Sequence, residues 1–250
     1  MKRETVTSAR NPLLVHLKKL LAARSYREAC GEFAADGTKL LEEAAKWYPG
    51  LETVVVQTGV EFCPLPEHVR VVEIPESLMR SVSQMEAPQG AIFICRLPEA
   101  RPAALRPGTL LLDGIQDPGN LGTILRTADA LEVPVVLLDG CADAYNPKTV
   151  RATMGAVFRT QPVRMTRAEA VQSCRAAGIP LLATAMSADA VDLRKKNLSG
   201  CAVVIGSEGR GVSAELFAAA DGKIIIPMNP RCESLNAAAA ATIVLWQMKC

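Results

Sequence analysis

Two short apolar runs near the C-terminus each open directly into a loop of glycine, proline and polar residues. The first run, residues 203–205, precedes the glycine-rich loop 206–211, and the second run, residues 224–226, precedes the loop 227–236. Short apolar runs bounded by turn residues predict buried strands, and ligand sites of α/β sheets lie where parallel strands end. The two loops therefore predict an α/β sheet in the C-terminal half of the chain, with a ligand site at one edge.

The chemistry of these two loops favours a ligand that is held largely by main-chain groups. They supply the Glu208 carboxylate and the polar side chains of Ser234 and Asn236, but no lysine. A dinucleotide loop reads G-x-G-x-x-G after the first strand, whereas residues 206–211 show the reverse order, late in the chain. The Glu208 carboxylate would also repel a pyrophosphate. A nicotinamide-dependent oxidoreductase is therefore disfavoured, and a pair of glycine turns without any ligand ranks below a ligand site.

The bulk composition bounds the class of protein. A chain of 250 residues, 49% of them hydrophobic, can bury one large core or two smaller ones. The apolar runs are too short and too interrupted to span a bilayer, and no apolar signal segment follows the first residues. The eight cysteines include no C-x-x-C pair, so neither a metal site nor a disulfide framework is expected, and Cys141 and Cys232 are interpreted as ordinary loop residues. We expect a cytoplasmic protein without a membrane partner.

A weak basic cluster marks the N-terminal region of a chain whose formal net charge is only +2. Arg10, Lys18, Lys19 and Arg24 lie close together, in a region where basic residues outnumber acidic ones. Such a cluster is compatible with contacts to RNA phosphates. A solvated helix face explains the same pattern equally well when this segment is considered alone.

A proline-rich stretch divides the chain into two parts. Residues 98–108 contain three prolines and a glycine, which predicts a linker between a first domain, residues 1–97, and a second domain, residues 109–250. The first domain is expected to be a small α/β unit. In the second, apolar runs alternate with helical patterns, which predicts a parallel sheet with helices on both faces. The expected strands are 53–56, 91–95, 109–112, 135–138, 181–184, 202–205 and 223–226. The expected helices are 12–23, 37–47, a short helix that begins at Pro75, 120–131, 147–155, 167–177, 213–220 and 235–248.

Two of these helices carry features that bear on function. In the helix 120–131 an apolar stripe runs along one side, and Arg126 falls roughly opposite that stripe. The helix 235–248 is apolar nearly all round, so we expect it to be buried, either within the monomer or at a subunit interface.

Three segments, in this order along the chain, resemble the motifs of a known family. Asn120-Leu121-Gly122 with Arg126-Thr127-Ala128 resembles N-x-G-x-x-x-R-x-A, and residues 206–211 resemble G-x-E-x-x-G. Ile226-Pro227-Met228, followed after five residues by Ser234-Leu235-Asn236, resembles the third motif. From about residue 109 onward the chain is thus similar to the SpoU/TrmH family of the SPOUT superfamily of RNA methyltransferases. Shorter cues in the first domain resemble the family's L30e-like RNA-binding extension.

The resemblance implies a fold and an activity that composition does not show. The fold is an α/β parallel sheet whose C-terminal segment is threaded into a deep trefoil knot, although chains are ordinarily unknotted. The activity is methyl transfer from S-adenosylmethionine to a ribose 2′-hydroxyl of RNA by a homodimer. The L30e-like extension favours ribosomal RNA over transfer RNA, by analogy alone. One alternative is an enzyme that methylates transfer RNA. The other is a non-catalytic RNA-binding member of the same fold, and the presence of Arg126 and Asn236 disfavours this second alternative.

The same resemblance implies roles for the motif residues. Arg126 lies beside the 2′-hydroxyl and the target phosphate, either as a base or as a stabiliser of the developing alkoxide, and a guanidinium does not readily lose a proton. Asn120, Ser234 and Asn236 orient Arg126, the ribose and the loop, while Glu208 shapes the cofactor loop or holds Arg126. The expected cofactor-binding residues are Thr184, Gly206, Gly211, Ile226, Met228 and Leu235. The expected RNA-binding residues are Arg10, Lys18, Lys19 and Arg24.

Two residues depart from the family's pattern. Pro230 stands where the third-motif loop commonly has glycine, and it is expected to stiffen that loop. Glu132 stands where a glycine often ends the first-motif helix. Neither departure removes a polar group that the reaction needs, but both bear on the local loop geometry.

Overall fold

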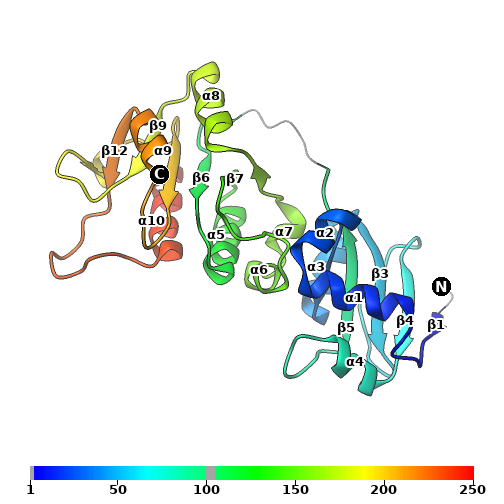
Figure 1. Ribbon diagram of the computed structural model, residues 1–250. Coiled ribbons are helices and arrows are strands. Elements are labelled where there is room, and N and C mark those ends of the chain that lie inside the picture. The colour runs from blue at the N-terminus through cyan, green and yellow to red at the C-terminus, as the bar shows by residue number, and fades with distance from the viewer. Residues whose placement is uncertain (1–2, 100–104) are drawn as a thin grey trace. The chain divides into compact units, whose positions relative to one another are not determined.

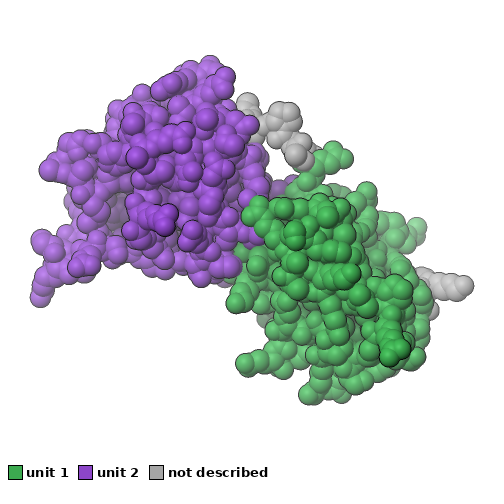
Figure 2. All heavy atoms as spheres, in the orientation of Figure 1, with its two compact units in different colours: residues 1–99, 145–159 green, residues 100–144, 160–250 purple. Residues whose placement is uncertain are grey.

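The computed structural model describes residues 3–99 and 105–250, and the chain forms two compact units (Figures 1 and 2). The N-terminal unit consists of Met1–Glu99 together with Tyr145–Arg159. The C-terminal unit consists of Ala100–Ala144 together with Thr160–Cys250. The chain therefore passes from one unit to the other three times, and two of these passages flank the segment 145–159.

The N-terminal unit is built on a five-stranded mixed sheet with the order β1-β4-β3-β5-β2. Leu14 and Leu17 of helix α1 pack into its core against Val55 and Ile92 of the sheet. All three helices and both strands that the sequence predicted here are present, including the short helix that begins at Pro75, whereas β1, β2, β4 and α2 carry weaker patterns and were missed. The strands are β1 (Arg3–Thr5), β2 (Glu32–Asp36), β3 (Leu51–Gln57), β4 (Arg70–Ile74) and β5 (Ala91–Arg96), and the helices are α1 (Pro12–Ala22), α2 (Arg24–Cys30), α3 (Thr38–Trp47) and α4 (Glu76–Val82).

The segment Tyr145–Arg159 carries two short helices into the aromatic core of the N-terminal unit. The ring centroids of Tyr145 and Phe158 lie 4.8 and 6.3 Å from that of Phe33. Aromatic side chains bury large apolar areas, so these contacts fasten the segment to the unit. The pattern of residues 147–155 predicted a helix but not the unit that it joins, and the domain boundaries inferred from the sequence stay predictions. The two helices are α6 (Pro147–Thr153) and α7 (Ala156–Arg159).

The C-terminal unit is built on a seven-stranded, wholly parallel sheet with the order β10-β12-β9-β11-β6-β7-β8. Alternate strand residues, among them Leu111 and Val204, pack in one core with helices α8 and α9. The intervening residues, among them Leu112 and Val203, are buried too. Both faces are therefore covered, which confirms the predicted α/β parallel sheet. The elements are β6 (Leu110–Asp113), α5 (Pro118–Ala130), β7 (Val135–Leu137), β8 (Val163–Arg164), α8 (Arg167–Ala177), β9 (Leu181–Thr184), β10 (Val191–Asp192), β11 (Ala202–Gly206), α9 (Ala214–Ala219) and β12 (Gly222–Ile225).

After β12 the chain returns across the sheet as α10 (Ala237–Lys249), which packs on α5 and β11. This return is what the knotted path implied by the resemblance requires. Val244 and Leu245 lie on the buried side of α10, whereas Ile243 and Trp246 are 40% and 63% exposed. The expectation that this helix is buried is therefore met on one side only. Neither α10 nor any other helix among the described residues has the length and apolar character needed to cross a membrane.

Helix α5 ends in a left-handed turn that contains no glycine. Glu132 has a φ of 52°, in the region that ordinarily favours glycine. The chain thus makes this turn with a residue other than glycine, at a cost of roughly 1–2 kcal/mol.

Candidate functional site

The loops of all three motifs meet at the carboxyl edge of the parallel sheet (Figure 1). β6 ends in the turn that leads to α5, β11 ends in the loop 206–211, and β12 leads into the loop 226–236. β11 pairs with β6 on one side and with β9 on the other, and β9 also pairs with β12. The strand order thus brings together segments that lie far apart in the sequence.

A closed glycine loop occupies the end of β11. Ser207 and Gly211 exchange two backbone hydrogen bonds of 3.2 and 2.8 Å, and Gly211 has a φ of 68°. A Cβ atom on Gly206 would lie 1.9 Å from the Gly211 carbonyl carbon, so no other residue fits there without a backbone change. The glycines at 206 and 211 are therefore required by the geometry of this closed loop, and their order does not indicate a dinucleotide-binding fingerprint.

The Glu208 carboxylate joins the three motifs by hydrogen bonds. Its Oε1 accepts from Asn120 Nδ2 at 2.5 Å, from Asn236 Nδ2 at 3.2 Å and from the Ala237 backbone N–H at 3.2 Å. Asn236 Nδ2 also donates to Asn120 Oδ1 at 3.0 Å. Hydrogen bonds to a charged group are stronger than neutral ones, so this network, the Glu208 network, fixes the loops of the three motifs against one another.

Two helix N-termini hold the asparagines of the Glu208 network in place. Asn236 caps α10, because its Oδ1 accepts from the backbone N–H groups of Ala238 and Ala239. Asp117 caps α5 in a similar way, by accepting from the Asn120 N–H at 2.7 Å. Each asparagine therefore lies at the start of a helix that packs into the core, and the helix positions its side chain.

The third-motif loop contains a tight turn at Pro230. The Cys232 N–H donates to the Asn229 carbonyl at 2.8 Å, and the Arg231 N–H donates to the Asn229 side-chain oxygen at 3.0 Å. Proline is favoured at the second position of such a turn, so Pro230 is compatible with the fold of this loop. Cys232 is exposed on the turn and Cys141 is buried elsewhere. Neither thiol joins the Glu208 network.

A pocket of about 460 Å³ opens beside the Glu208 network, among the ends of β9, β11 and β12. All six residues that the resemblance assigns to the cofactor line it, and Glu208 and Ser234 line it as well. Its volume lies within the ordinary range of small-molecule sites, about 300–1,000 Å³. We call it the cofactor pocket. Its lining residues from the expected set are Thr184, Gly206, Gly211, Ile226, Met228 and Leu235.

The lining of the cofactor pocket suits S-adenosylmethionine better than a nucleotide polyphosphate. Apolar residues such as Phe217 and Ile225 form much of the wall. Among the described residues, the charged side chains on the wall are the carboxylates of Glu208 and Glu233 and the guanidinium of Arg210. A ligand with a sulfonium cation and no phosphate is compatible with this charge balance, whereas a polyphosphate would meet two like charges.

Arg126 stands apart from this constellation. Its side chain is exposed on α5 and makes no hydrogen bond or ion pair within the described part of the chain. It does not line the cofactor pocket, and Glu208 bonds to two asparagines instead of to Arg126. The structure thus brings Asn120, Glu208 and Asn236 together and places Ser234 on the pocket wall, but leaves Arg126 open to a ligand.

A buried aspartate that the sequence reasoning missed anchors the same edge of the sheet. Asp113 ends β6, is 2% exposed, and accepts from Arg167 Nε at 2.8 Å and from the Ser213 N–H at 2.7 Å. Buried charges persist where they are paired and hydrogen-bonded, and these bonds tie β6 to the starts of α8 and α9. The sequence signal that could have identified Asp113 is a charged residue that directly ends an apolar run.

The residues expected to contact RNA lie on the N-terminal unit, on or beside α1 and α2. All of them are exposed. Arg24 pairs with Glu28 one turn later at 2.7 Å, and the Lys19 ammonium lies 5.3 Å from the Tyr26 ring centroid. Because all four side chains are exposed, their charged groups are accessible to a ligand such as a phosphate. The four residues are Arg10, Lys18, Lys19 and Arg24.

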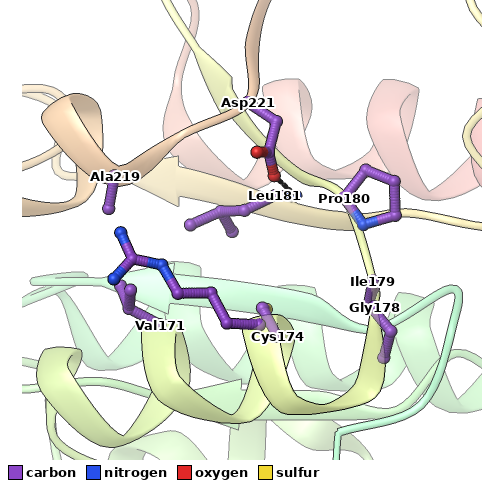
Figure 3. A pocket seen from close by; sticks show the side chains of 9 residues that line it. Val171, Cys174, Gly178, Ile179, Pro180, Leu181, Ala219 and Asp221 are labelled. Carbon is purple, nitrogen blue, oxygen red and sulfur yellow. Dashed lines mark hydrogen bonds between the residues drawn. The ribbon is translucent and has the colours of Figure 1, made fainter.

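A second pocket of about 460 Å³ lies between α8, α9 and the start of β9 (Figure 3). Its wall includes Val171 and Cys174 of α8, and also Asp221, whose carboxylate accepts from the Leu181 N–H at 2.8 Å. It shares no lining residue with the cofactor pocket and holds no residue of the three motifs. The chemistry of the motifs therefore belongs to the cofactor pocket, and the second pocket is suited to control substitutions.

Comparisons with known proteins agree with this geometry. Residues 107–246 match the SpoU rRNA Methylase family, and residues 11–92 match the MRM3-like substrate binding domain. The chain is 34% identical, over 98% of its own length and 98% of the relative's, to the 23S rRNA (guanosine(2553)-2′-O)-methyltransferase RlmP of Bacillus subtilis (strain 168). The crystal structure of an AdoMet-bound rRNA methyltransferase from Sinorhizobium meliloti has a TM-score of 0.86 at 30% identity, covering 99% of this chain and 97% of that one. The SpoU methyltransferase AviRb from Streptomyces viridochromogenes, in complex with AdoMet, has a TM-score of 0.82 at 28% identity, covering 96% and 97%.

Proposed function

The chain belongs to the SpoU rRNA methylase family and uses S-adenosylmethionine as its cofactor, and from this premise we propose that it methylates a ribose 2′-hydroxyl of ribosomal RNA. The observation that carries the proposal is the Glu208 network, which fixes the three motif loops beside one pocket of suitable size and charge. In this proposal the C-terminal unit binds the cofactor and does the chemistry, while the N-terminal unit selects the RNA. The enzyme acts on its RNA in the cytoplasm, as a homodimer.

The protein's part in the reaction is chiefly to position the reactants. The bound cofactor supplies a methyl group that its sulfonium already activates, so no further activation of that group is required of the protein. Gly206 and Gly211 let the backbone come close to the ligand, and Ile226 and Leu235 hold the adenosine end through backbone groups. The Glu208 network keeps these loops in register, and Ser234 orients the ribose. Thr184 and Met228 complete the wall.

Arg126 acts in this proposal on the acceptor side of the reaction. The 2′-hydroxyl must lose a proton as its oxygen attacks, and negative charge develops on that oxygen. An arginine side chain stays protonated in proteins, so we assign Arg126 to binding the target phosphate and stabilising the developing alkoxide rather than to removing the proton. Its exposed, unpaired guanidinium on α5 supports this role.

Removing the Glu208 carboxylate should loosen all three motif loops at once. We expect Glu208→Ala to lower the affinity for S-adenosylmethionine and the rate of methyl transfer by roughly tenfold or more each, because hydrogen bonds to charged groups contribute about 1.5–3 kcal/mol. Titration calorimetry and single-turnover assays measure the two quantities. Glu215→Ala, at an exposed glutamate of α9 outside the cofactor pocket, is the matched control. Unchanged values for Glu208→Ala would mean that the network does not organise the site.

Transfer of a radiolabelled methyl group from S-adenosylmethionine tests the proposed activity. Purified ribosomal RNA from cells that lack this protein should accept the label, and nuclease digestion should release it as a 2′-O-methylnucleoside. Transfer RNA from the same cells tests the alternative substrate. Label in transfer RNA alone would favour the alternative, and label in neither RNA would contradict the proposal.

The homodimer part of the proposal rests on the exposed side of α10. Ile243 and Trp246 leave large apolar side chains open on that side, and exposed apolar groups of this kind mark interaction surfaces. We expect Trp246→Glu to shift the protein from dimer to monomer in sedimentation, whereas Trp47→Glu, at an exposed tryptophan of the N-terminal unit, should leave the dimer intact. Ala239 is exposed on the same helix, so a bulky residue there is a second probe of the dimer. Ala240 lines the cofactor pocket, so a change at that position would not probe the dimer alone. An active wild-type monomer would contradict the assignment.

The RNA-selecting role of the N-terminal unit is tested by charge reversal. We expect the double change Lys18→Glu and Lys19→Glu to weaken RNA binding. The slope of the logarithm of the binding constant against the logarithm of the salt concentration should become shallower by about 0.7–0.9 for each phosphate that the protein no longer neutralises. The affinity for S-adenosylmethionine should not change, because the cofactor pocket lies in the C-terminal unit. Unchanged RNA affinity and salt slope would return the cluster to its alternative interpretation as a solvated helix face.

Deleting residues 1–97 is a poorer test of the same role. If residues 109–250 formed an independent domain, a protein that begins near residue 106 would fold and bind the cofactor. Val150 and Phe158 of the segment 145–159 are fully buried, and Phe158 packs on Phe33 of the N-terminal unit. The deletion would uncover these apolar side chains, so the truncated protein is now expected to be destabilised or to aggregate.

A further inference from the structure

A small pocket adjoins the cofactor pocket at the Glu208 network. It has a volume of about 160 Å³ and is lined by residues 114–117, Asn120, residues 207–210 and Ala237. We call it the side pocket. Because the two pockets share part of their wall, a ligand in the side pocket lies next to the bound cofactor. The shared residues are Ser207, Glu208, Arg210 and Ala237.

Arg210 supplies the positive charge of the shared wall. Its side chain is exposed and makes no hydrogen bond or ion pair within the residues that the structure describes. The two acids that line the side pocket are engaged elsewhere, since Glu208 accepts three hydrogen bonds and Asp117 caps α5. The guanidinium therefore keeps its donors for a ligand, and a planar fork of N–H groups matches the geometry of a phosphate.

The remainder of the side pocket suits a flat, uncharged group. Gly114 and Gly209 leave parts of the wall without side chains, and a Cβ atom on Gly209 would meet no atom within 4 Å. The exposed amide of Gln116 also lines the pocket and can both donate and accept hydrogen bonds. The volume is below the usual range for small-molecule sites, about 300–1,000 Å³. A single base or ribose is therefore a better occupant than a second cofactor.

The methylated nucleotide itself does not account for the side pocket. Its 2′-oxygen must reach both the methyl group and Arg126, which lines neither pocket and lies six residues beyond Asn120 on α5. Six residues advance an α-helix by about 9 Å and turn it by about 240°. Asn120 and Arg126 thus lie on different sides of α5, so we take the side pocket and Arg126 to contact different nucleotides.

From these observations we infer that the side pocket receives a nucleotide adjacent to the methylated one, with Arg210 on its phosphate and Gln116 on the edge of its base. The inference rests on the proposed function, because it takes the cofactor pocket and Arg126 to flank the methylated ribose. Phosphate contacts position an RNA and base-edge contacts specify its sequence. Gln116 and Arg210 would therefore help to decide which sequence around the ribose is accepted.

Two substitutions in the full-length protein test the inference. Gly209→Leu adds a side chain to a residue that lines the side pocket, and Gly209 does not line the cofactor pocket, so the affinity for S-adenosylmethionine should stay within about twofold of wild type. Arg210→Gln removes the cation. Arg210→Gln should lower kcat/KM by roughly ten- to hundredfold for ribosomal RNA from cells that lack the protein, as for the loss of a charged hydrogen bond. Gly209→Leu should lower it for the same RNA because the added side chain hinders the nucleotide. Only Arg210→Gln should also flatten the salt dependence of RNA binding, by about 0.7–0.9 in slope.

Gly200→Leu is the matched steric control. A Cβ atom on Gly200 also meets no atom within 4 Å, neither Gly200 nor Gly209 has a positive φ, and Gly200 lines neither pocket. Wild-type kcat/KM in both test variants would overturn the inference and leave the proposed function intact. A loss of cofactor affinity in Gly209→Leu as large as its loss of methylation would overturn it as well. Absence of RNA methylation by the wild-type protein would contradict the proposed function itself.

Discussion

Replacing Arg126 with alanine is expected to slow methyl transfer by about a hundredfold or more, the usual effect of removing one group that stabilises developing charge. The affinity for S-adenosylmethionine should survive, because Arg126 does not line the cofactor pocket and forms no hydrogen bond or ion pair with the residues of the Glu208 network. Its loss is felt instead at the target phosphate and at the 2′-oxygen. Single-turnover methylation and titration calorimetry measure the two quantities separately.

The controls for Arg126 separate its geometry from its charge. Arg126→Lys should also fail, because an ammonium is a point charge without the planar fork of a guanidinium. Arg175→Ala removes an exposed arginine that lines the second pocket, away from the motifs, and should behave like the wild-type protein. Near-normal turnover in Arg126→Ala, or an equal loss of cofactor affinity, would rule out the assigned role.

Gly206→Ala is expected to abolish measurable binding of S-adenosylmethionine. The added Cβ atom would lie 1.9 Å from the Gly211 carbonyl carbon and 2.1 Å from the Val212 nitrogen. Backbone atoms cannot swing aside as the end of a side chain can, so the closed loop must open and the pocket wall must move. Overpacking of this kind typically costs about 1–3 kcal/mol. Titration calorimetry follows the binding, and thermal unfolding shows whether the fold persists.

Gly200→Ala is the control for this change, because a Cβ atom there meets nothing within 4 Å. It should bind the cofactor as the wild-type protein does. Wild-type affinity in Gly206→Ala would mean that the glycine loop is not part of the cofactor site. The expected result is loss of binding with a cooperative unfolding transition whose melting temperature falls by several degrees, since a cost of about 1–3 kcal/mol weakens the fold without abolishing it.

The parallel sheet could be predicted from the sequence because strands that are buried on both faces appear as continuous apolar runs. β8 and β10 could not, since each has only two residues and shows no run. The helical pattern of residues 147–155 is local and was readable. Its packing depends on β2, more than a hundred residues earlier in the chain, which no local pattern reveals.

Part of the grouping of the motif residues could be predicted, but not its atomic detail. Neighbouring strand ends indicated that Glu208, Ser234 and Asn236 would lie at one edge of the sheet, and the family resemblance added Asn120. One oxygen of the Glu208 carboxylate accepts from three donors, and this arrangement depends on the residues at which α5 and α10 begin. Those starts cannot be predicted from the sequence to a single residue. Asp113 was missed because a single aspartate at the end of a strand is not distinctive. Which side of α10 the core covers could not be predicted, because an all-round apolar pattern does not distinguish the sides of a helix.

Mapping the 2′-O-methyl groups of ribosomal RNA at nucleotide resolution tests the central claim most directly. The maps of three cell lines are compared: cells with the wild-type protein, cells without it, and cells that carry Arg126→Ala in its place. The account predicts a 2′-O-methyl group that is present in the first map and absent from the other two. Identical ribosomal RNA maps in all three would contradict it.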